Sequence, residues 1–266
     1  MPTFELALRS HPGTKRPENQ DSCGRLDEDP SRVLVVVADG VGGYEGGLEA
    51  SSLAVAVTLD TFRHNPVHWG PEKRIARAVQ QGNIAVHDRA MIVTELHHMR
   101  TTLTALVVDG PELYVAHVGD CRLYLAREGA MIQLTKDHTV AAERNRLSLA
   151  RPDPVADRVG RSTLTRCLGG ELIVAIDRIS RTLQGGDVLL LCSDGLYNVL
   201  DDRELHTLAT MRNPEDACQA LIEAANEDGS PDNVTAAVVR MADDLPPPEK
   251  LSLGDRLARM IGRREE

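Results

Sequence analysis

The sequence predicts an α+β fold in which antiparallel sheets are covered by helices. Strand-like segments come in runs instead of alternating one by one with helices, which argues against a regular βαβ fold. Two turn signals, Asp109-Gly110 and Glu128-Gly129, are typical of hairpins between neighbouring antiparallel strands. The 266 residues are 42% hydrophobic and only 3% aromatic, so aliphatic side chains must build a substantial core.

The first part of the chain is expected to place strands before two long helices. In chain order, the apolar and polar patterns predict a strand over 3–10, a polar loop over 11–31 with at most a short strand near Cys23, a buried strand over 32–38, and helices over 48–63 and 71–98. Runs of strands separated from runs of helices favour antiparallel sheets that are covered by helices.

The second part is expected to contain most of the remaining strands and two more helices. The patterns predict strands over 101–108, 112–118, 121–127 and 130–134, an irregular charged insertion over 138–162, strands over 172–181 and 187–193, helices over 201–211 and 214–227, and a last strand over 233–240. Asn213-Pro214 is a suitable N-cap and first-turn pair for a helix. We expect one domain over 1–242, then a linker and a short basic amphipathic tail over 243–266.

Charge and composition exclude several classes of protein. The formal net charge of −10 argues against broad binding to nucleic acid or to an anionic membrane. No segment approaches the length of a membrane span, and the N-terminus lacks the apolar core of a signal peptide. Five cysteines without a Cys-x-x-Cys motif indicate buried, reduced thiols. We therefore expect a cytoplasmic protein, with a monomer as the default.

Four aspartates at the ends of strand-like apolar runs are the most informative feature of the chain. Asp39, Asp120 and Asp194 follow such runs, and Asp232 opens the last one. Loops at the ends of buried strands are where a scaffold presents functional groups. Carboxylates gathered there would repel one another unless a cation held them, and oxygen ligands select Mg or Mn over Zn. The sequence therefore predicts a carboxylate metal site on a buried sheet.

Eight motifs then resemble, in order, those of the metal-dependent Ser/Thr protein phosphatases, the PPM or type 2C family, especially its compact bacterial members. They are GTKRPENQDS at 13–22, VVADGVGG at 36–43, RTTLTALVV at 100–108, VAHVGDCRLYL at 115–125, LTKDHT at 134–139, LTRCLGG at 164–170, LLCSDGLYNVL at 191–200 and SPDNVTAAVV at 230–239. The resemblance covers residues 3–240 and implies a four-layer α-β-β-α sandwich of two mainly antiparallel sheets flanked by helices.

The resemblance also implies a set of metal ligands. Asp39 would bridge two metal ions, Mn²⁺ or Mg²⁺, with the carbonyl of Gly40 on one of them. Asp194 and Asp232 would complete the other ion, and Asp21 matches an acidic position beside the second, as a direct ligand or through water. The nucleophile would be a water or hydroxide that bridges the two ions.

Two further residues match the family's pattern. Asp120 corresponds to the position of a third, weaker metal in bacterial relatives, and Arg16 to the arginine that grips the substrate phosphate. A guanidinium can bind phosphate in a bidentate manner, which explains Arg instead of Lys. The chain departs from the family at Tyr44, where relatives usually carry His, and at Leu48 and Arg100, but none of these changes removes a predicted ligand.

Each residue also has a simpler interpretation when taken alone. An Asp-Gly pair after a strand is commonly only a turn, and Asp232-Asn233 could be a capping pair. Arg16 in a polar loop is usually a solvated charge, and we expect His138 to be a structural histidine. The joint pattern favours the metal-site interpretation for the aspartates and the phosphate-binding interpretation for Arg16.

The expected function is hydrolysis of phosphoserine and phosphothreonine in phosphorylated proteins, in opposition to Ser/Thr kinase signalling. Partners would include a Ser/Thr kinase or its substrates, and no nucleic acid. The alternatives are a pseudophosphatase that binds phosphoproteins without turnover and, more weakly, a two-metal phosphoesterase for small molecules or nucleic acid. The complete acidic set favours an active enzyme, because a pure binding module does not need it.

Overall fold

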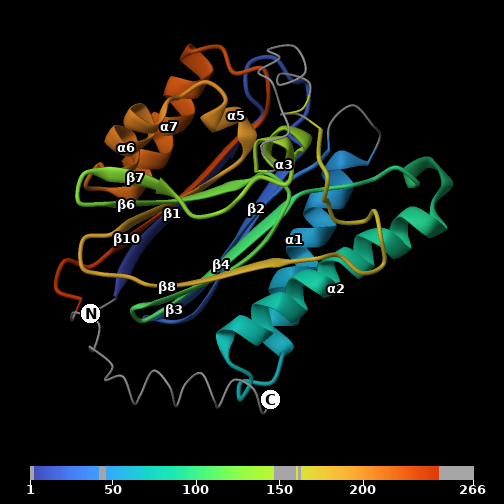
Figure 1. Cartoon of the computed structure of the whole chain (residues 1–266), viewed down its shortest axis with the longest axis horizontal. Helices are drawn as coiled ribbons and strands as arrows, with labels where there is room; N and C mark the ends of the chain where they lie inside the picture. The colour runs from blue at the N-terminus through green and yellow to red at the C-terminus, as the bar shows by residue number, and fades with distance from the viewer. Residues whose placement is uncertain (1–2, 42–45, 147–159, 161–162, 246–266) are drawn as a thin grey trace.

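The structure is a computed structural model that describes residues 3–41, 46–146, 160 and 163–245. It has four layers, with two five-stranded sheets packed face to face and helices on both outer faces (Figure 1). This arrangement confirms the α+β fold and the sandwich that the sequence predicts. No helix in the described part of the chain is long and apolar enough to cross a membrane.

Both sheets are antiparallel throughout. The first has the order β1-β10-β9-β6-β7, built from β1 (Phe4–His11), β10 (Val234–Met241), β9 (Val188–Cys192), β6 (Arg122–Arg127) and β7 (Ala130–Gln133). The second has the order β2-β3-β4-β5-β8, built from β2 (Asp21–Asp29), β3 (Arg32–Asp39), β4 (Leu103–Asp109), β5 (Glu112–Val118) and β8 (Asp177–Thr182).

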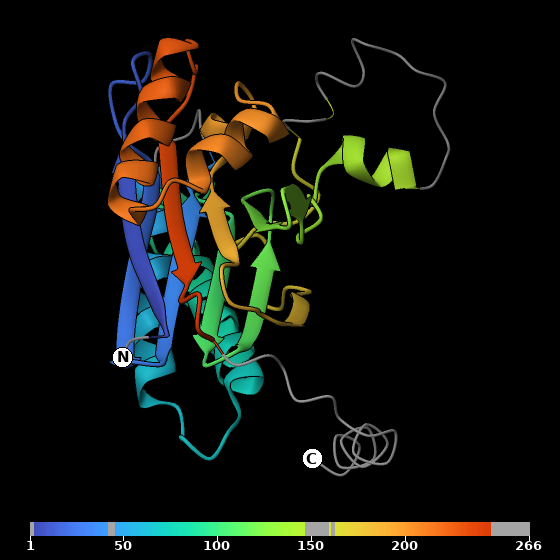
Figure 2. The same ribbon diagram turned by 90° about the vertical axis from the view of Figure 1, so that its left-hand side faces the viewer.

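Helices cover the outer face of each sheet. The helices α1 (Gly47–His64) and α2 (Pro71–Ile92) pack on the second sheet, while α6 (Asp202–Ala209) and α7 (Pro214–Glu227) pack on the first. The short α5 (Asp194–Tyr197) lies against β10 and α7. A further short helix, α3 (Val140–Arg146), stands away from the two sheets in Figure 2.

The core explains why the central strands are continuous apolar runs in the sequence. In β3, Val33 and Val35 face the space between the two sheets, whereas Leu34 and Val36 face the helices α1 and α2. Successive side chains of a strand point to opposite faces, so a strand that is buried on both faces must be apolar at every position. The same burial on both faces fixes where β3 and β9 end, and therefore where the acidic residues after them lie.

Local turn and capping signals are confirmed. Gly110, Glu128 and Gly129 all have positive φ values, of 56°, 52° and 79°, as hairpin turns require. Asn213 caps α7, because its side-chain oxygen accepts a hydrogen bond from the backbone N–H of Glu215 at 2.9 Å.

The main error of the sequence prediction is β2, which was expected as a loop with at most a short strand near Cys23. It is a nine-residue strand that pairs with β3 along its length. The polar composition of this segment does not indicate a strand, because β2 lies at the edge of its sheet and has exposed side chains such as Arg25 and Asp27. On its other face Gly24 lies close to Leu59 of α1, where an added Cβ would stand 2.8 Å from the Leu59 Cδ1 atom.

Several other boundaries differ from the prediction. The helix expected over 71–98 ends at Ile92, where consecutive β-branched residues lower helix propensity, and a short 3₁₀ turn, Thr94–Leu96, follows. The strand expected over 172–181 begins only at Asp177, where pairing with β5 starts. The insertion expected to be irregular contains α3, and α5 was not expected. Tyr44, residues 147–159, 161 and 162 of the insertion, and the tail lie outside the described residues.

Candidate metal centre

The predicted acidic residues come from four separate segments that end at the same side of the two sheets. Asp21 and Asp39 are cross-strand partners where β2 begins and β3 ends. Asp194 follows β9, and Asp232 precedes β10, the strand that pairs with β9. The fold therefore brings together residues that lie up to 211 positions apart, as the sequence predicts.

The backbone around Asp39 is fixed by two threonines of the segment before β4. The carbonyl of Asp39 accepts hydrogen bonds from the Thr102 N–H and the Thr101 hydroxyl, both at 2.8 Å. The Asp39 N–H donates to the Thr102 hydroxyl at 3.0 Å. The next residue, Gly40, has no room for a side chain, because an added Cβ would stand 2.4 Å from the carbonyl oxygen of Gly47. Close packing thus holds both residues in one position.

Asp21 is buried and held on one side. Its Oδ2 accepts hydrogen bonds from the Ser193 and Thr235 hydroxyls, each at 2.7 Å. Its Oδ1 is also buried, but it has no hydrogen-bond partner. Burial raises the pKa of Asp21 to about 7, although the two hydroxyl groups lower it. The carboxylate is therefore oriented by the protein while one of its oxygens remains available.

Asp194 shows the same arrangement. Its Oδ2 accepts a hydrogen bond from the Asn198 side chain at 3.1 Å, and its Oδ1 is buried without a partner. Burial, followed by the negative charge of Asp232, raises the pKa of Asp194 to about 6. For Asp39, burial and then the charges of its acidic neighbours raise the pKa well above its usual value. The carboxylates thus lie close enough to disfavour one another's ionisation.

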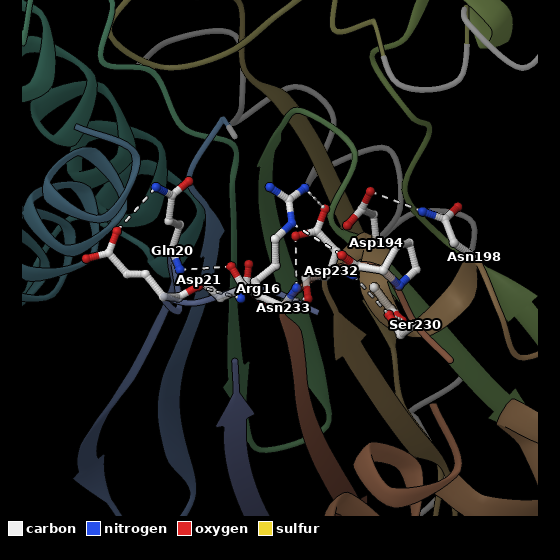
Figure 3. A network of polar contacts seen from close by, with 12 residues as sticks. Arg16, Gln20, Asp21, Asp194, Asn198, Ser230, Asp232 and Asn233 are labelled. Atoms are coloured by element: carbon white, nitrogen blue, oxygen red, sulfur yellow. Dashed lines mark hydrogen bonds and ion pairs between the residues drawn. The ribbon is translucent and has the colours of Figure 1, made fainter. Parts of the chain in front are cut away.

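Asp232 is partly exposed, and it has a cationic partner. Arg16 Nη2 lies 2.8 Å from Asp232 Oδ2, and Arg16 Nε donates to the Pro231 carbonyl at 3.2 Å. The two side chains are 40% and 30% exposed. Figure 3 shows this pair beside Asp194. The structure therefore brings Arg16 to the acidic cluster, as the sequence predicts.

Asn233 is a site residue for which the sequence suggested only a capping role. Its Nδ2 donates to the carbonyls of Pro12 and Glu18, both at 2.9 Å, and its Oδ1 accepts the Gln20 N–H at 2.8 Å. These bonds tie the loop that carries Arg16 to the start of β10 (Figure 3). The sequence signal for Asn233 was its place beside Asp232 in the SPDNVTAAVV motif. The hydroxyls of Ser193 and Thr235 carried no signal that separates them from other strand residues.

Asp120 lies two residues beyond the end of β5 and is buried, at 8% exposure. Burial, followed by the charge of Asp194, raises the pKa of Asp120 to about 8. Its carbonyl accepts a hydrogen bond from the Tyr197 hydroxyl at 3.0 Å. Nearby, His138 exchanges hydrogen bonds with Gly119, whose N–H donates to His138 Nδ1 at 3.0 Å, which supports the structural role expected for this histidine.

The donor set fits hard divalent cations. The two unpartnered, buried oxygens of Asp21 and Asp194 would be costly without a positive charge beside them. All donors are oxygens, which suits Mg²⁺ or Mn²⁺. Within the described residues, however, no group of three or more Asp, Glu, His or Cys side chains is already arranged so that it could hold a metal ion. For a metal ion to bind Asp232, the ion pair between Asp232 and Arg16 would have to change.

Comparison with known proteins gives a consistent result. The family model described as protein phosphatase 2C matches residues 9–233. The Ser/Thr phosphatase stp of Listeria innocua serovar 6a is 31% identical over 236 residues, covering 87% of this chain and 94% of that protein. The crystal structure of the Mycobacterium tuberculosis Ser/Thr phosphatase PstP/Ppp aligns with a TM-score of 0.79 at 32% identity, covering 90% of this chain and 99% of that one. The catalytic domain of PstP in complex with two manganese ions aligns with a TM-score of 0.78 at 31% identity, covering 90% and 99%.

Proposed function

The chain belongs to the protein phosphatase 2C family, and from this premise we propose that it is a metal-dependent phosphatase of phosphoserine and phosphothreonine in proteins. The observation that carries the proposal is the pair of buried, unpartnered carboxylate oxygens on Asp21 and Asp194, beside the acidic neighbours Asp39 and Asp232. A module that only bound phosphoproteins would gain nothing from this costly arrangement. An active enzyme is therefore favoured over a pseudophosphatase.

We assign the following roles to the acidic residues. Asp39 would be shared by two Mn²⁺ or Mg²⁺ ions, with the Gly40 carbonyl on one of them and Asp194 and Asp232 on the other. Asp21 would lie beside the second ion. The PstP structure with two manganese ions supports this number, because that chain shares the fold and 31% of the residues. Asp120 is proposed for a third, weaker site.

The chain's own residues would orient the reaction. When bound, two divalent ions lower the pKa of a water that attacks phosphorus and stabilise charge on the phosphoryl oxygens. Arg16 would bind the phosphate oxygens through its planar guanidinium. The hydroxyls of Ser193 and Thr235 hold Asp21, and the Asn198 amide holds Asp194, so each carboxylate presents its other oxygen to the site.

The biological setting follows from the proposed reaction. Phosphorylated proteins would be the substrates, including a Ser/Thr kinase or the targets of one, so that the phosphatase opposes kinase signalling. We infer a cytoplasmic protein, which the five free cysteines support because free thiols are usual in a reducing compartment. A monomer is the default expectation.

Release of phosphate from a phosphothreonine peptide, by chelator-treated protein with and without added Mn²⁺ or Mg²⁺, tests the proposal. We expect turnover only with the metal, and loss of nearly all turnover in Asp39→Asn and Asp194→Asn. Asp216→Asn, at an exposed position on α7, is the matched control for the loss of one carboxylate. Full activity of Asp39→Asn, or activity in excess chelator, would refute the two-metal mechanism. Peptide binding without phosphate release would establish the pseudophosphatase instead.

A further inference from the structure

Arg16 and Asp232 form an ion pair with each other in the structure. The proposed function gives each of them another partner, the substrate phosphate for Arg16 and a metal ion for Asp232. Asp232 Oδ2 lies 2.8 Å from Arg16 Nη2, and Asp232 Oδ1 accepts the Asn233 N–H at 2.9 Å. Both oxygens of this carboxylate are therefore engaged. The neighbouring Asp194, by contrast, has a buried oxygen without a partner (Figure 3).

A cation at Asp232 would compete with Arg16 for the same oxygen. A guanidinium and a divalent ion beside the same oxygen, Asp232 Oδ2, would repel each other, so binding of the ion weakens the pairing with Arg16. Since Asp194 is adjacent, an ion bound between the two carboxylates would draw Asp232 away from Arg16. The guanidinium that is released carries donors that can bind phosphate.

The surrounding backbone restricts this exchange to the two side chains. The loop that bears Arg16 is tied to β10 by the three hydrogen bonds of the Asn233 side chain. At Gly13, with φ 77°, the loop approaches so closely that an added Cβ would stand 2.3 Å from the Asp232 carbonyl oxygen. Because the loop is held at these points, Arg16 remains beside the site whichever partner it has.

We propose that Arg16 exchanges between two anions: the Asp232 carboxylate while the metal site is empty, and the substrate phosphate once the site is loaded. This inference deepens the proposed function and depends on it for the identity of the second anion. Metal binding and phosphate capture are then linked through one ion pair, since each metal ion that takes Asp232 makes Arg16 available. Arg16 thereby delays phosphate capture until the site is loaded.

Binding of Mn²⁺ to chelator-treated protein, measured by calorimetry without phosphate, tests the exchange. The variant is Arg16→Gln, and the matched control is Lys15→Gln, which removes the same charge from the adjacent exposed position. Partly exposed ion pairs are weak, so we expect Arg16→Gln to bind Mn²⁺ about two- to fivefold more tightly than Lys15→Gln does. An affinity equal to or lower than that of the control would overturn the proposal.

A second measurement separates exchange from a purely structural role. Without metal, Arg16→Gln should melt at a lower temperature than Lys15→Gln, because Asp232 has lost its partner. With saturating Mn²⁺ the difference should disappear, because the ion replaces Arg16 at Asp232. A difference that persists in Mn²⁺ would show that Arg16 only ties its loop to β10, and would overturn the exchange.

Two further assays distinguish a failure of the proposed exchange from a failure of the proposed function. Inorganic phosphate should bind the Mn²⁺-loaded wild-type protein more tightly than loaded Arg16→Gln, and equal affinities would overturn the second half of the exchange. Turnover of the phosphothreonine peptide by the wild-type protein with Mn²⁺ is measured in parallel. Without turnover the proposed function fails, while the metal-binding and melting results still decide whether Arg16 and the ion compete for Asp232.

Discussion

Replacing Gly195 with alanine should separate the two segments that carry Asp194 and Asp232. An alanine Cβ at this position would stand 2.0 Å from the carbonyl oxygen of Asn233, whereas ordinary contacts begin at 3.4 Å. The two backbones must therefore move apart by about 1.4 Å, which is the difference between these distances. The Ser230 hydroxyl, which donates to the Gly195 carbonyl at 2.8 Å, restrains the same contact and limits relaxation.

The effect on activity should be large compared with the effect on folding. A misplacement of about 1 Å at reacting groups can cost about a hundredfold in rate, so we expect kcat/KM on a phosphothreonine peptide to fall by about that factor or more. Overpacking typically costs about 1–3 kcal/mol of stability, which a thermal melt would detect. The Mn²⁺ concentration for half-maximal activity should rise, because Asp194 and Asp232 no longer converge.

The control for this substitution is Gly70→Ala, since Gly70 has a φ of −59° and no atom within 4 Å of an added Cβ. This variant should keep the activity and metal requirement of the wild-type protein. Wild-type kcat/KM and an unchanged Mn²⁺ requirement in Gly195→Ala would refute the reasoning, because they would show that the spacing of the two segments does not set the geometry of the site.

Three further predictions concern the carboxylates and the tail. Ser193→Ala removes one hydroxyl from Asp21 and should weaken Mn²⁺ binding by about 10- to 100-fold in a calorimetric titration, whereas Ser52→Ala, at an exposed hydroxyl of α1, should not. Burial raises the pKa of Asp21 to about 7 and that of Asp120 to about 8, from 3.8. The folded metal-free chain thus holds protons that the unfolded chain releases, so its melting temperature should fall as the pH rises from about 4 to about 8, and Mn²⁺ should reduce this dependence. Deletion of residues 246–266 should leave peptide turnover nearly unchanged, and a large loss would place the tail in the catalytic domain.

The sequence predicted the elements that are buried on both faces most accurately. Both β3 and β9 are uninterrupted apolar runs, and their ends correctly located Asp39 and Asp194. The prediction failed where tertiary pairing outweighs local composition. The polar segment of β2 becomes a strand because the backbone of β3 provides hydrogen-bond partners along its whole length. The segment has no periodicity that would indicate this pairing.

The sequence predicted the charged residues of the candidate site but not the residues that hold them in place by hydrogen bonds. Carboxylates at the ends of apolar runs can be read directly from a sequence, and their occurrence together with the other motifs indicated the site. The hydroxyls of Ser193 and Thr235 and the amide of Asn233 act through contacts between segments more than 170 positions apart. Threonine is common in strands for packing reasons alone and serine is common in turns, so only the fold distinguishes these residues from their neighbours.

The supports also explain which carboxylate can change partners. Asp21 is 5% exposed and receives two hydroxyl hydrogen bonds, so any movement would leave buried donors unsatisfied. The side chain of Asp232 is 30% exposed, and water can replace Arg16 when the ion pair opens. The free-energy cost of exchange is therefore lower at Asp232 than at Asp21. A site with one exchangeable carboxylate beside firmly held ones can stay folded without an ion, and still release its arginine when the ion binds.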